Sequence, residues 1–258
     1  MRNQYQCQQM LPIRKKHHRI LASFKEQSPV ALLLKRTFDI VFSLLVIVFL
    51  LSWLLPILAV LVKLSSKGPV FFIQERIGAK GKVFKCLKVR SMVVNAQANV
   101  KQAEANDPRI TPIGRFLRDS CMDELPQFFN VLKGDMSIVG PRPHMVKDCN
   151  DFSRLVPNYG YRHSVKPGIT GMAQVKGYRG ETHCIYDISH RYRWDVFYVN
   201  NYSFLLDVKI IYKTYIQTVA AVLNLSENKL SKTTINTKQV EVTQVKVVER
   251  YSEQLVEA

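Results

Sequence analysis

The chain has 258 residues, 47% of them hydrophobic, which is enough for one domain with a sizeable core plus appendages. Its 37 Lys and Arg against 20 Asp and Glu give a net charge of +17, which points to an anionic partner: nucleic acid, an anionic membrane face or a phosphorylated substrate. The five cysteines are odd in number and form no Cys-x-x-Cys pair, which argues against a disulfide framework or a structural zinc site and fits a reducing, cytosol-facing environment.

The N-terminal part of the chain contains one long apolar run. Residues 1–30 are a basic, polar segment without the apolar core and cleavage site of a signal peptide. From Ile40 to Val62 there follow 23 residues without a charge. A straight helix of that length measures about 34 Å, enough to cross the roughly 30 Å hydrocarbon layer of a bilayer. A single spanning helix is therefore the ordinary interpretation.

Two features of this run predict a re-entrant helix instead. Pro56 removes the backbone hydrogen bond to the carbonyl of Ser52, so a kink or break is expected between these two residues. Residues 1–36 and 63–90 each carry eight Lys and Arg, so the positive-inside rule gives no asymmetry for a crossing. We therefore predict a helix-break-helix over residues 31–64 that enters and leaves the membrane on the same side.

The rest of the chain is predicted to form a small mixed α/β domain over residues 65–223, followed by a polar tail over residues 224–258, so the fold class is α+β. Apolar residues at 205, 208, 212 and 215 recur at helical spacing beside a polar face. Such an amphipathic helix either packs on the domain, which is commoner, or lies in the membrane interface. The other expected elements are two strands around a Gly-Ala-Lys-Gly turn in 69–92 and helices in 93–105, 112–119 and 123–133.

Two adjacent carboxylates, Asp123 and Glu124, precede a proline that is typical of a first helical turn, Pro126. Acids at a helix start usually act as caps. Here the surroundings favour chemistry, because a carboxylate can attack phosphorus when nearby cations suppress the charge repulsion. The second carboxylate could hold a divalent metal, since neighbouring helical side chains diverge by about 100°.

Several cations could complete such a phosphate site. Each alone is most often a solvated surface charge, but together with a helix start they could cradle phosphates. Arg142 lies between Pro141 and Pro143, which restrict the backbone and direct the side chain. The other candidates are Arg118, before the acid pair, and Lys88 and Arg90, at the end of the second strand.

Five stretches of the chain resemble a known family, the bacterial polyprenyl-phosphate sugar-1-phosphate transferases, which are monotopic phosphoglycosyltransferases. In family order from Lys35 to Ile211 they read KRTFDIVFSLL, SSKGPVFFIQERIGAKGKVFKCLKVRSM, ITPIGRFLRDSCMDELPQFFNVLKGDMSIVGPRPHM, VKPGITGMAQVKGYRGET and DVFYVNNYSFLLDVKII. The resemblance implies a re-entrant membrane helix and a catalytic domain on the cytoplasmic face of the bacterial inner membrane. It also implies a ping-pong mechanism at the first membrane step of exopolysaccharide, capsule or glycan synthesis.

By position, Asp123 matches the family's nucleophile and Glu124 its Mg²⁺ partner. The resemblance implies attack on a UDP-sugar, release of UMP, and transfer of the phosphosugar to polyprenyl (undecaprenyl) phosphate. The GYRGET and FYVNNYSFLLD segments look like those of the hexose-transferring members, which suggests glucose or galactose 1-phosphate. Positions linked to phosphate handling are Lys88, Arg118, Arg142, Pro141 and Pro143, with Gln74 and Arg76 in less defined roles.

Some residues depart from the family pattern, and some alternatives stay open. Met172 and Lys176 stand where Trp and Asn are common, and Asp119 and Cys121 precede the acid pair where a basic or small polar residue and a Ser are usual.

The expected partners are UDP-sugar, polyprenyl phosphate and membrane lipid, with a homodimer left open. A membrane-tethered nucleic-acid-binding protein is disfavoured, because the charge is spread along the chain and nucleic-acid motifs are missing. An ordinary sugar transferase would release UDP. Metal-ligating roles for His144, His163 and His183 are disfavoured by their spacing.

Overall fold

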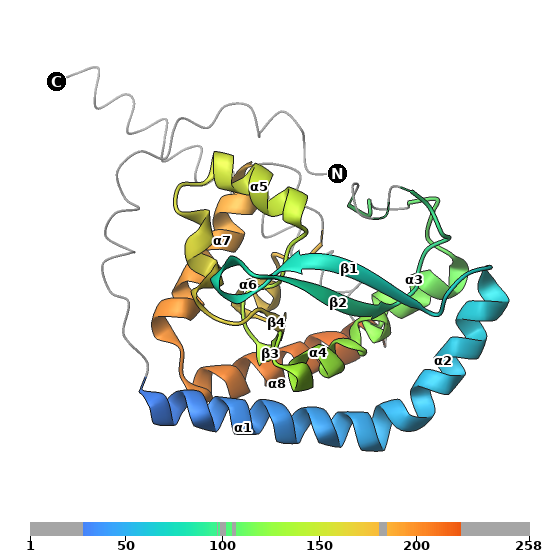
Figure 1. The fold of residues 1–258 in the computed structure, drawn as a ribbon, viewed down its shortest axis with the longest axis horizontal. Helices are drawn as coiled ribbons and strands as arrows, with labels where there is room; N and C mark the ends of the chain where they lie inside the picture. Colours follow the sequence, from blue (N-terminus) through green and yellow to red (C-terminus); the bar gives the residue numbers. More distant parts are fainter. Residues whose placement is uncertain (1–27, 97, 99–101, 105–106, 181–184, 223–258) are drawn as a thin grey trace, which may run out of the picture. The chain divides into compact units, whose positions relative to one another are not determined.

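A computed structural model describes residues 28–96, 98, 102–104, 107–180 and 185–222 (Figure 1). Most of the predicted basic segment and the predicted tail lie outside the described residues. The chain forms two compact units, Met1–Tyr215 and Ile216–Ala258. Of the second unit, the described part is the end of one helix, up to Val222.

The apolar run forms one helical segment in three parts: α1 (Pro29–Val46), a π-helical turn η2 (Ile47–Leu51) and α2 (Ser52–Ser65). Ser28 caps the start, because its hydroxyl accepts a hydrogen bond from Ala31 N–H. Among the described residues, this is the one helix long and apolar enough to cross a membrane, and only 17% of its most apolar window is buried. Large apolar side chains therefore remain exposed along both α1 and α2.

The helix bends but does not break where the sequence predicts a break. Ser52 and Pro56 both lie inside α2, and the direction of the segment changes between α1 and α2 (Figure 1). The π turn just before Ser52 accommodates the bend, since kinks in helices typically coincide with prolines or π turns. The Ser52 hydroxyl donates back to the Val48 carbonyl at 2.6 Å, a bond that helical serines commonly form and that often accompanies a bend.

Polar side chains tie α1 to the domain. The Lys35 ammonium lies 2.6 Å from the Asp207 carboxylate and 3.1 Å from the Val139 carbonyl. Arg36 donates to two carbonyls at the end of α4 (Gln127–Lys133). The buried Asp39 carboxylate accepts from Ile138 N–H at 3.0 Å, on strand β3 (Ser137–Val139). The N-terminal half of the apolar helix is therefore fixed to the domain.

Arg90, which the sequence predicts as a phosphate-binding residue, ties the other end of the helix to the same domain. The guanidinium is buried and donates to the carbonyls of Val62, Ser66 and Lys67 at the end of α2. Strand β2 ends at Val89, so Arg90 is free to turn toward α2 while Lys88 stays on the strand. Arg90 thus caps a helix whose last carbonyls would otherwise be unsatisfied.

We expect Arg90→Met to lower the melting temperature by several degrees, because three carbonyls lose a charged donor, a loss of roughly 2–3 kcal/mol. The measurement is thermal melting in detergent, with Lys85→Met as the control, since Lys85 is an exposed residue of the same strand. The specific activity of the folded fraction should be retained. A normal melting temperature with lost activity would restore the phosphate-binding role.

The domain contains two small sheets. As the sequence predicts, two strands flank the Gly-Ala-Lys-Gly turn: β1 (Phe71–Ile77) and β2 (Val83–Val89) form an antiparallel hairpin, in which Gln74 pairs with Cys86. The Gly-Ala-Lys-Gly turn includes Lys80 at φ +54° and Gly81 at φ +74°. A second, parallel pair joins β3 to β4 (Gly168–Thr170), which was not predicted. Because β3 leads directly into Pro141 and Arg142, this pair positions the candidate site.

Short helices surround the sheets. Helix α3 begins and ends at the predicted residues, and Gly134 ends α4 at φ +97°. The predicted helix over 93–105 is wrong for the described residues there: Val93 N–H donates instead to the Arg109 carbonyl, across the loop. The remaining elements are α3 (Pro112–Asp119), η4 (Met122–Glu124), α5 (Val146–Leu155), η5 (Tyr159–Ser164), α6 (Met172–Val175), α7 (Ile185–Asn201), α8 (Phe204–Val222) and the η3 turn (Ala79–Gly81).

The predicted amphipathic helix is α8, but its apolar stripe does not pack on the domain. Leu205, Tyr212 and Tyr215 are 71%, 64% and 63% exposed, whereas Asp207 and Ile210 are buried. The polar Asp207 faces inward because it pairs with Lys35. The less common alternative of the sequence analysis, an interfacial helix, therefore fits this surface better, since contiguous exposed apolar residues mark interaction sites.

The largest hydrophobic core lies between α1, β2, α4, β3, α7 and α8. Leu51 of the π turn and Phe128 of α4 are among its buried members. A second cluster joins α2, β2 and α3 through Leu58, Val89 and Leu117. The apolar helix therefore contributes side chains to both cores, and it is part of the domain's packing rather than a separate anchor.

Candidate active site

The predicted acid pair lies on η4, a short turn between α3 and α4. Cys121 precedes it in the left-handed region at φ +59° and redirects the chain out of α3. Both carboxylates are buried, with Asp123 6% and Glu124 8% exposed. Exposed capping acids would leave their carboxylates in water, so burial of two adjacent acids indicates a built site.

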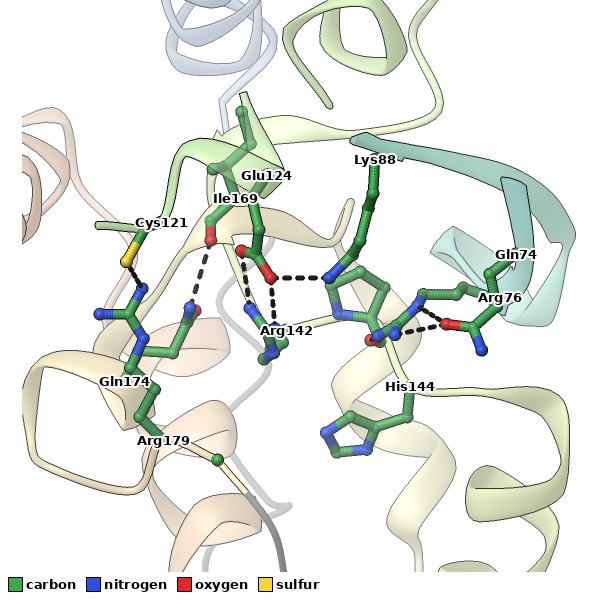
Figure 2. Close-up of polar contacts among 12 residues, drawn as sticks. Gln74, Arg76, Lys88, Cys121, Glu124, Arg142, His144, Ile169, Gln174 and Arg179 are labelled. Atoms are coloured by element: carbon green, nitrogen blue, oxygen red, sulfur yellow. Dashed lines mark hydrogen bonds and ion pairs between the residues drawn. The ribbon is translucent and has the colours of Figure 1, made fainter. Parts of the chain in front are cut away.

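Glu124 is neutralised by two of the predicted cations (Figure 2). Its carboxylate lies 2.7 Å from Lys88 Nζ and forms a two-pronged ion pair with Arg142, at 2.5 and 3.0 Å. Burial alone would raise the pKa of Glu124, but Arg142 and Lys88 hold that pKa well below its usual value. Glu124 is therefore ionised and fully paired.

Asp123 contrasts with its neighbour. Among the described residues, its carboxylate has no hydrogen-bond or ion-pair partner. Burial raises the pKa of Asp123, and the positive charges of Lys88, Arg118 and Arg142 offset part of that rise. A buried carboxylate with cations near it, but with no direct partner, keeps its oxygen lone pairs available for reaction.

Arg142 is held by a buried ion pair that the sequence analysis missed. The Arg162 guanidinium donates to the Arg142 carbonyl at 2.6 Å and to the Asp195 carboxylate at 2.8 Å. Arg162 and Asp195 are each 1% exposed, and the flanking Pro141 and Pro143 are buried. No sequence signal distinguishes Arg162 from the many surface arginines of so basic a chain.

Gln74 and Arg76 lie at the edge of this cluster (Figure 2). Arg76 donates to the Gln74 side chain at 2.7 Å and to the Pro143 carbonyl. Gln74 in turn contacts Met145 Sδ at 3.0 Å. Both residues therefore support the Pro-Arg-Pro segment from strand β1, and their charge and donors adjoin the site.

The predicted cations fall into three groups. Lys88 and Arg142 bind Glu124 directly. Arg118 is exposed in the last turn of α3, and it lies close enough to lower the pKa of Asp123. Arg90 lies apart, at the end of α2.

A loop after α6 brings another arginine to the site. Arg179 donates to Cys121 Sγ at 2.9 Å, two residues before Asp123 (Figure 2). Gly177 and Gly180, at φ +89° and +95°, flank it and permit the turn. Burial raises the pKa of the Cys121 thiol, which agrees with a packing role rather than a nucleophilic one.

The residues that depart from the family pattern lie at different depths. Met172 packs against the main core, and the Lys176 ammonium lies 4.7 Å from the centre of the Trp194 ring. Asp119 is exposed at the end of α3. Among the described residues, Met172, Lys176 and Asp119 form no hydrogen bond or ion pair with the acid pair.

A protein-only metal cage is not present in the described residues, where no three His, Cys, Asp or Glu side chains cluster. The carboxylates of Asp123 and Glu124 are the oxygen donors nearest the site. Mg²⁺ typically takes one or two carboxylates and completes its shell with water and substrate phosphate oxygens. The donor set therefore fits Mg²⁺ only together with a phosphorylated substrate.

Comparison with known proteins places this site in a family. The family profile described as "Bacterial sugar transferase" matches residues 30–221, which include α1, the acid pair and α8. The chain belongs to this family. A "UDP-glucose:undecaprenyl-phosphate glucose-1-phosphate transferase" of Escherichia coli (strain K12) is 49% identical over 188 residues, which are 72% of the chain and 40% of that relative.

Other bacterial sugar transferase relatives differ in length and in the sugar they are named for. A "UDP-N-acetylgalactosamine-undecaprenyl-phosphate N-acetylgalactosaminephosphotransferase" of Aeromonas hydrophila is 44% identical over 72% of the chain and 44% of its own length. An "Exopolysaccharide production protein PSS" of Rhizobium leguminosarum bv. phaseoli is 44% identical over 72% of the chain and 94% of its own length. The chain thus spans about two-fifths of the longer relatives and nearly all of the shorter one.

Proposed function

We propose that this bacterial sugar transferase moves a sugar 1-phosphate from a UDP-sugar to polyprenyl (undecaprenyl) phosphate, with release of UMP. The observation that carries the proposal is the contrast within the acid pair. Asp123 is buried and unpaired among the described residues, while Glu124 beside it is neutralised by Lys88 and Arg142. The names of the relatives support the reaction class.

The reaction has two balanced steps. An Asp123 carboxylate oxygen attacks the β-phosphorus of the UDP-sugar, so that an acyl phosphate bond forms, the bond to the bridging oxygen breaks, and UMP leaves with the electron pair. A phosphate oxygen of the lipid then attacks the same phosphorus. The acyl phosphate bond breaks, the Asp123 carboxylate is regenerated, and polyprenyl diphosphate sugar is the product.

The cations make this attack electrostatically feasible. In the free protein Lys88 and Arg142 neutralise Glu124. When a diphosphate enters, its oxygens compete for the same two side chains, and Arg118 adds a third cation near Asp123. A Glu124 carboxylate released in this exchange, together with the substrate phosphates, would hold Mg²⁺, which supplies further neutralisation of the diphosphate charge.

The membrane arrangement follows from the two ends of the apolar helix. Lys35 and Arg36 fix α1 to the domain, and Arg90 fixes the end of α2 to it. Because both ends of this helical segment are attached to one domain, both ends lie on the same side of the bilayer. The helix is therefore re-entrant in this proposal. The exposed apolar stripe of α8 lies in the same interface, on the cytoplasmic face, where nucleotide sugars are made.

The transferred group is a hexose 1-phosphate in this proposal, and the step begins exopolysaccharide, capsule or glycan assembly. Relatives named for glucose, galactose and N-acetylgalactosamine all match this chain, so the match does not identify the sugar. Assays with a panel of UDP-sugars would identify the donor substrate. Purified protein in nanodiscs with undecaprenyl phosphate, Mg²⁺ and each UDP-sugar should release UMP. Release of UDP instead would show an ordinary sugar transferase and would refute the proposal.

The pH dependence of the first step should report Asp123. Only the carboxylate attacks, and burial raises its pKa above the usual 3.8, so the rate of UMP release without lipid should rise with pH through that raised pKa. Lys88→Met removes a positive charge that lowers the pKa of Asp123. The rise of the UMP release rate with pH should therefore occur at higher pH in this variant. Lys85→Met, on the exposed face of the same strand, should leave it in place. An unchanged pH dependence of the rate in Lys88→Met would contradict the assignment of this step to Asp123.

A further inference from the structure

His144, directly after the Pro-Arg-Pro segment, is buried between two arginines. Its Nδ1 atom lies 2.6 Å from the Tyr159 hydroxyl and 3.3 Å from a guanidinium nitrogen of Arg162. Its Nε2 atom lies 3.5 Å from a guanidinium nitrogen of Arg191. Burial lowers the pKa of His144 well below its usual value, and the neighbouring arginines lower it further, so the ring is neutral.

The two arginine contacts cannot both be hydrogen bonds. A neutral imidazole has one acceptor nitrogen and one N–H, and a guanidinium only donates. The shorter contacts gather at Nδ1, where Arg162 and the tyrosine hydroxyl can both donate. With the ring proton on Nε2, Nδ1 accepts at both of its shorter contacts, and the Nε2–H points toward another donor, Arg191.

The Arg191 guanidinium is only partly satisfied by hydrogen bonds to the described residues. It is 7% exposed, one of its terminal nitrogens donates to the Gly180 carbonyl at 3.0 Å, and its Nε is buried without a hydrogen-bond partner among the described residues. In contrast, Arg162 is satisfied by Asp195 and by the Arg142 carbonyl. With that tautomer, the Nε2–H of His144 and the Nε–H of Arg191 are buried donors that have no acceptor among the described residues, which costs free energy unless an acceptor fills the place between them.

Two short stretches of chain connect this place to residues that contact the acid pair or its neighbour Cys121. His144 is two residues from Arg142, which binds Glu124. Gly180, which Arg191 holds, follows Arg179, whose guanidinium contacts Cys121. A ligand oxygen bound here would therefore be held by one residue that follows the Pro-Arg-Pro segment and by one that contacts the Arg179–Gly180 loop.

We propose that the His144 Nε2–H and Arg191 bind the phosphate of the nucleotide half of the donor, and thereby position the leaving group opposite Asp123. This inference rests on the proposed function. A phosphate suits the place because its oxygens are acceptors with negative charge, which charge-assisted donors prefer. Sugar hydroxyls both donate and accept, so a place that offers only donors fits them less well.

Binding of UMP and of uridine to the intact protein in nanodiscs tests the proposal. Arg191→Met should weaken UMP binding by about 10-fold or more, as expected for loss of a charged hydrogen bond, and should leave uridine binding within about 2-fold. Arg193→Met, an exposed arginine of the same helix, should change neither affinity. Equal loss of UMP and uridine affinity, or unchanged UMP affinity, would overturn the proposal.

Because Arg191 is buried, its replacement could impair folding, so a measurement on the unaltered chain is needed. In protein with ¹⁵N-labelled histidine, His144 should show the Nε2–H form in the free state, and saturation with UMP should shift this resonance whereas uridine should not. An unshifted resonance at saturating UMP would overturn the proposal even if every variant failed to fold. Asp123→Asn should show the same shift, which separates nucleotide binding from the covalent step.

Discussion

Asp123→Asn is expected to reduce turnover by about 10⁴-fold or more, because the amide oxygen cannot act as the nucleophile that forms the acyl phosphate. The change is isosteric and removes a buried charge that has no partner in the described part of the chain. The melting temperature should therefore stay the same or rise, as is common when a functional group held in an unfavourable setting is replaced. Initial rates of UMP release with saturating undecaprenyl phosphate measure the effect.

The matched control for this change is Asp119→Asn. Asp119 is exposed on α3, four residues before the nucleophile, so its replacement removes the same charge from the same neighbourhood. We expect its turnover to stay within a few-fold of the unaltered protein, since surface charges act weakly through solvent. Near-normal turnover of Asp123→Asn would refute the covalent mechanism.

Asp195→Asn is expected to destabilise the protein by about 3–5 kcal/mol, because it leaves the Arg162 guanidinium buried without its counter-ion. This is a large part of the stability of an ordinary domain. The folded fraction should also lose activity, since Arg162 holds the carbonyl of Arg142. Thermal melting and UMP release per folded molecule measure the two effects.

Two further variants distinguish the loss of the buried Arg162–Asp195 ion pair from the general effect of removing a charge. Asp151→Asn removes one partner of an exposed pair with Arg154, 3.8 Å apart, and should shift stability by less than about 1 kcal/mol. The double change Arg162→Met with Asp195→Leu removes both buried charges and should recover much of the lost stability, but not the activity. Full activity in the double variant would contradict the role given to Arg162.

The sequence predicted those parts of the fold and site that depend on neighbouring residues. The hairpin around Gly-Ala-Lys-Gly, the bounds of α3 and the end of α4 at Gly134 follow from turn and capping chemistry, which is local. Lys88 and Arg142 were predicted to cradle phosphates beside the acid pair, whereas their ion pairs with Glu124 itself were not predicted. The structure brings these residues together through β2, η4 and the segment after β3.

Features that depend on tertiary contacts were missed or misplaced. Arg90 and Lys88 look equivalent in sequence, yet the end of β2 between them sends one to α2 and the other to Glu124. From the sequence, the apolar stripe of α8 fitted either packing on the domain or the membrane interface, and the structure turns Asp207 to the domain because Lys35 supplies a buried counter-ion. Arg162, Arg179 and Arg191 carry no local signal, since a chain of this charge has many arginines, and only the fold buries Arg162 and Arg191 and brings the exposed Arg179 to Cys121.

Intact-mass spectrometry after a single turnover, with UDP-sugar and Mg²⁺ but without lipid, tests the central claim most directly. The account predicts that the protein gains the mass of one sugar phosphate, that the label maps to the peptide containing Asp123, and that added undecaprenyl phosphate removes it. UMP formed only when lipid is present, with no mass gain at any time before lipid is added, would contradict the account.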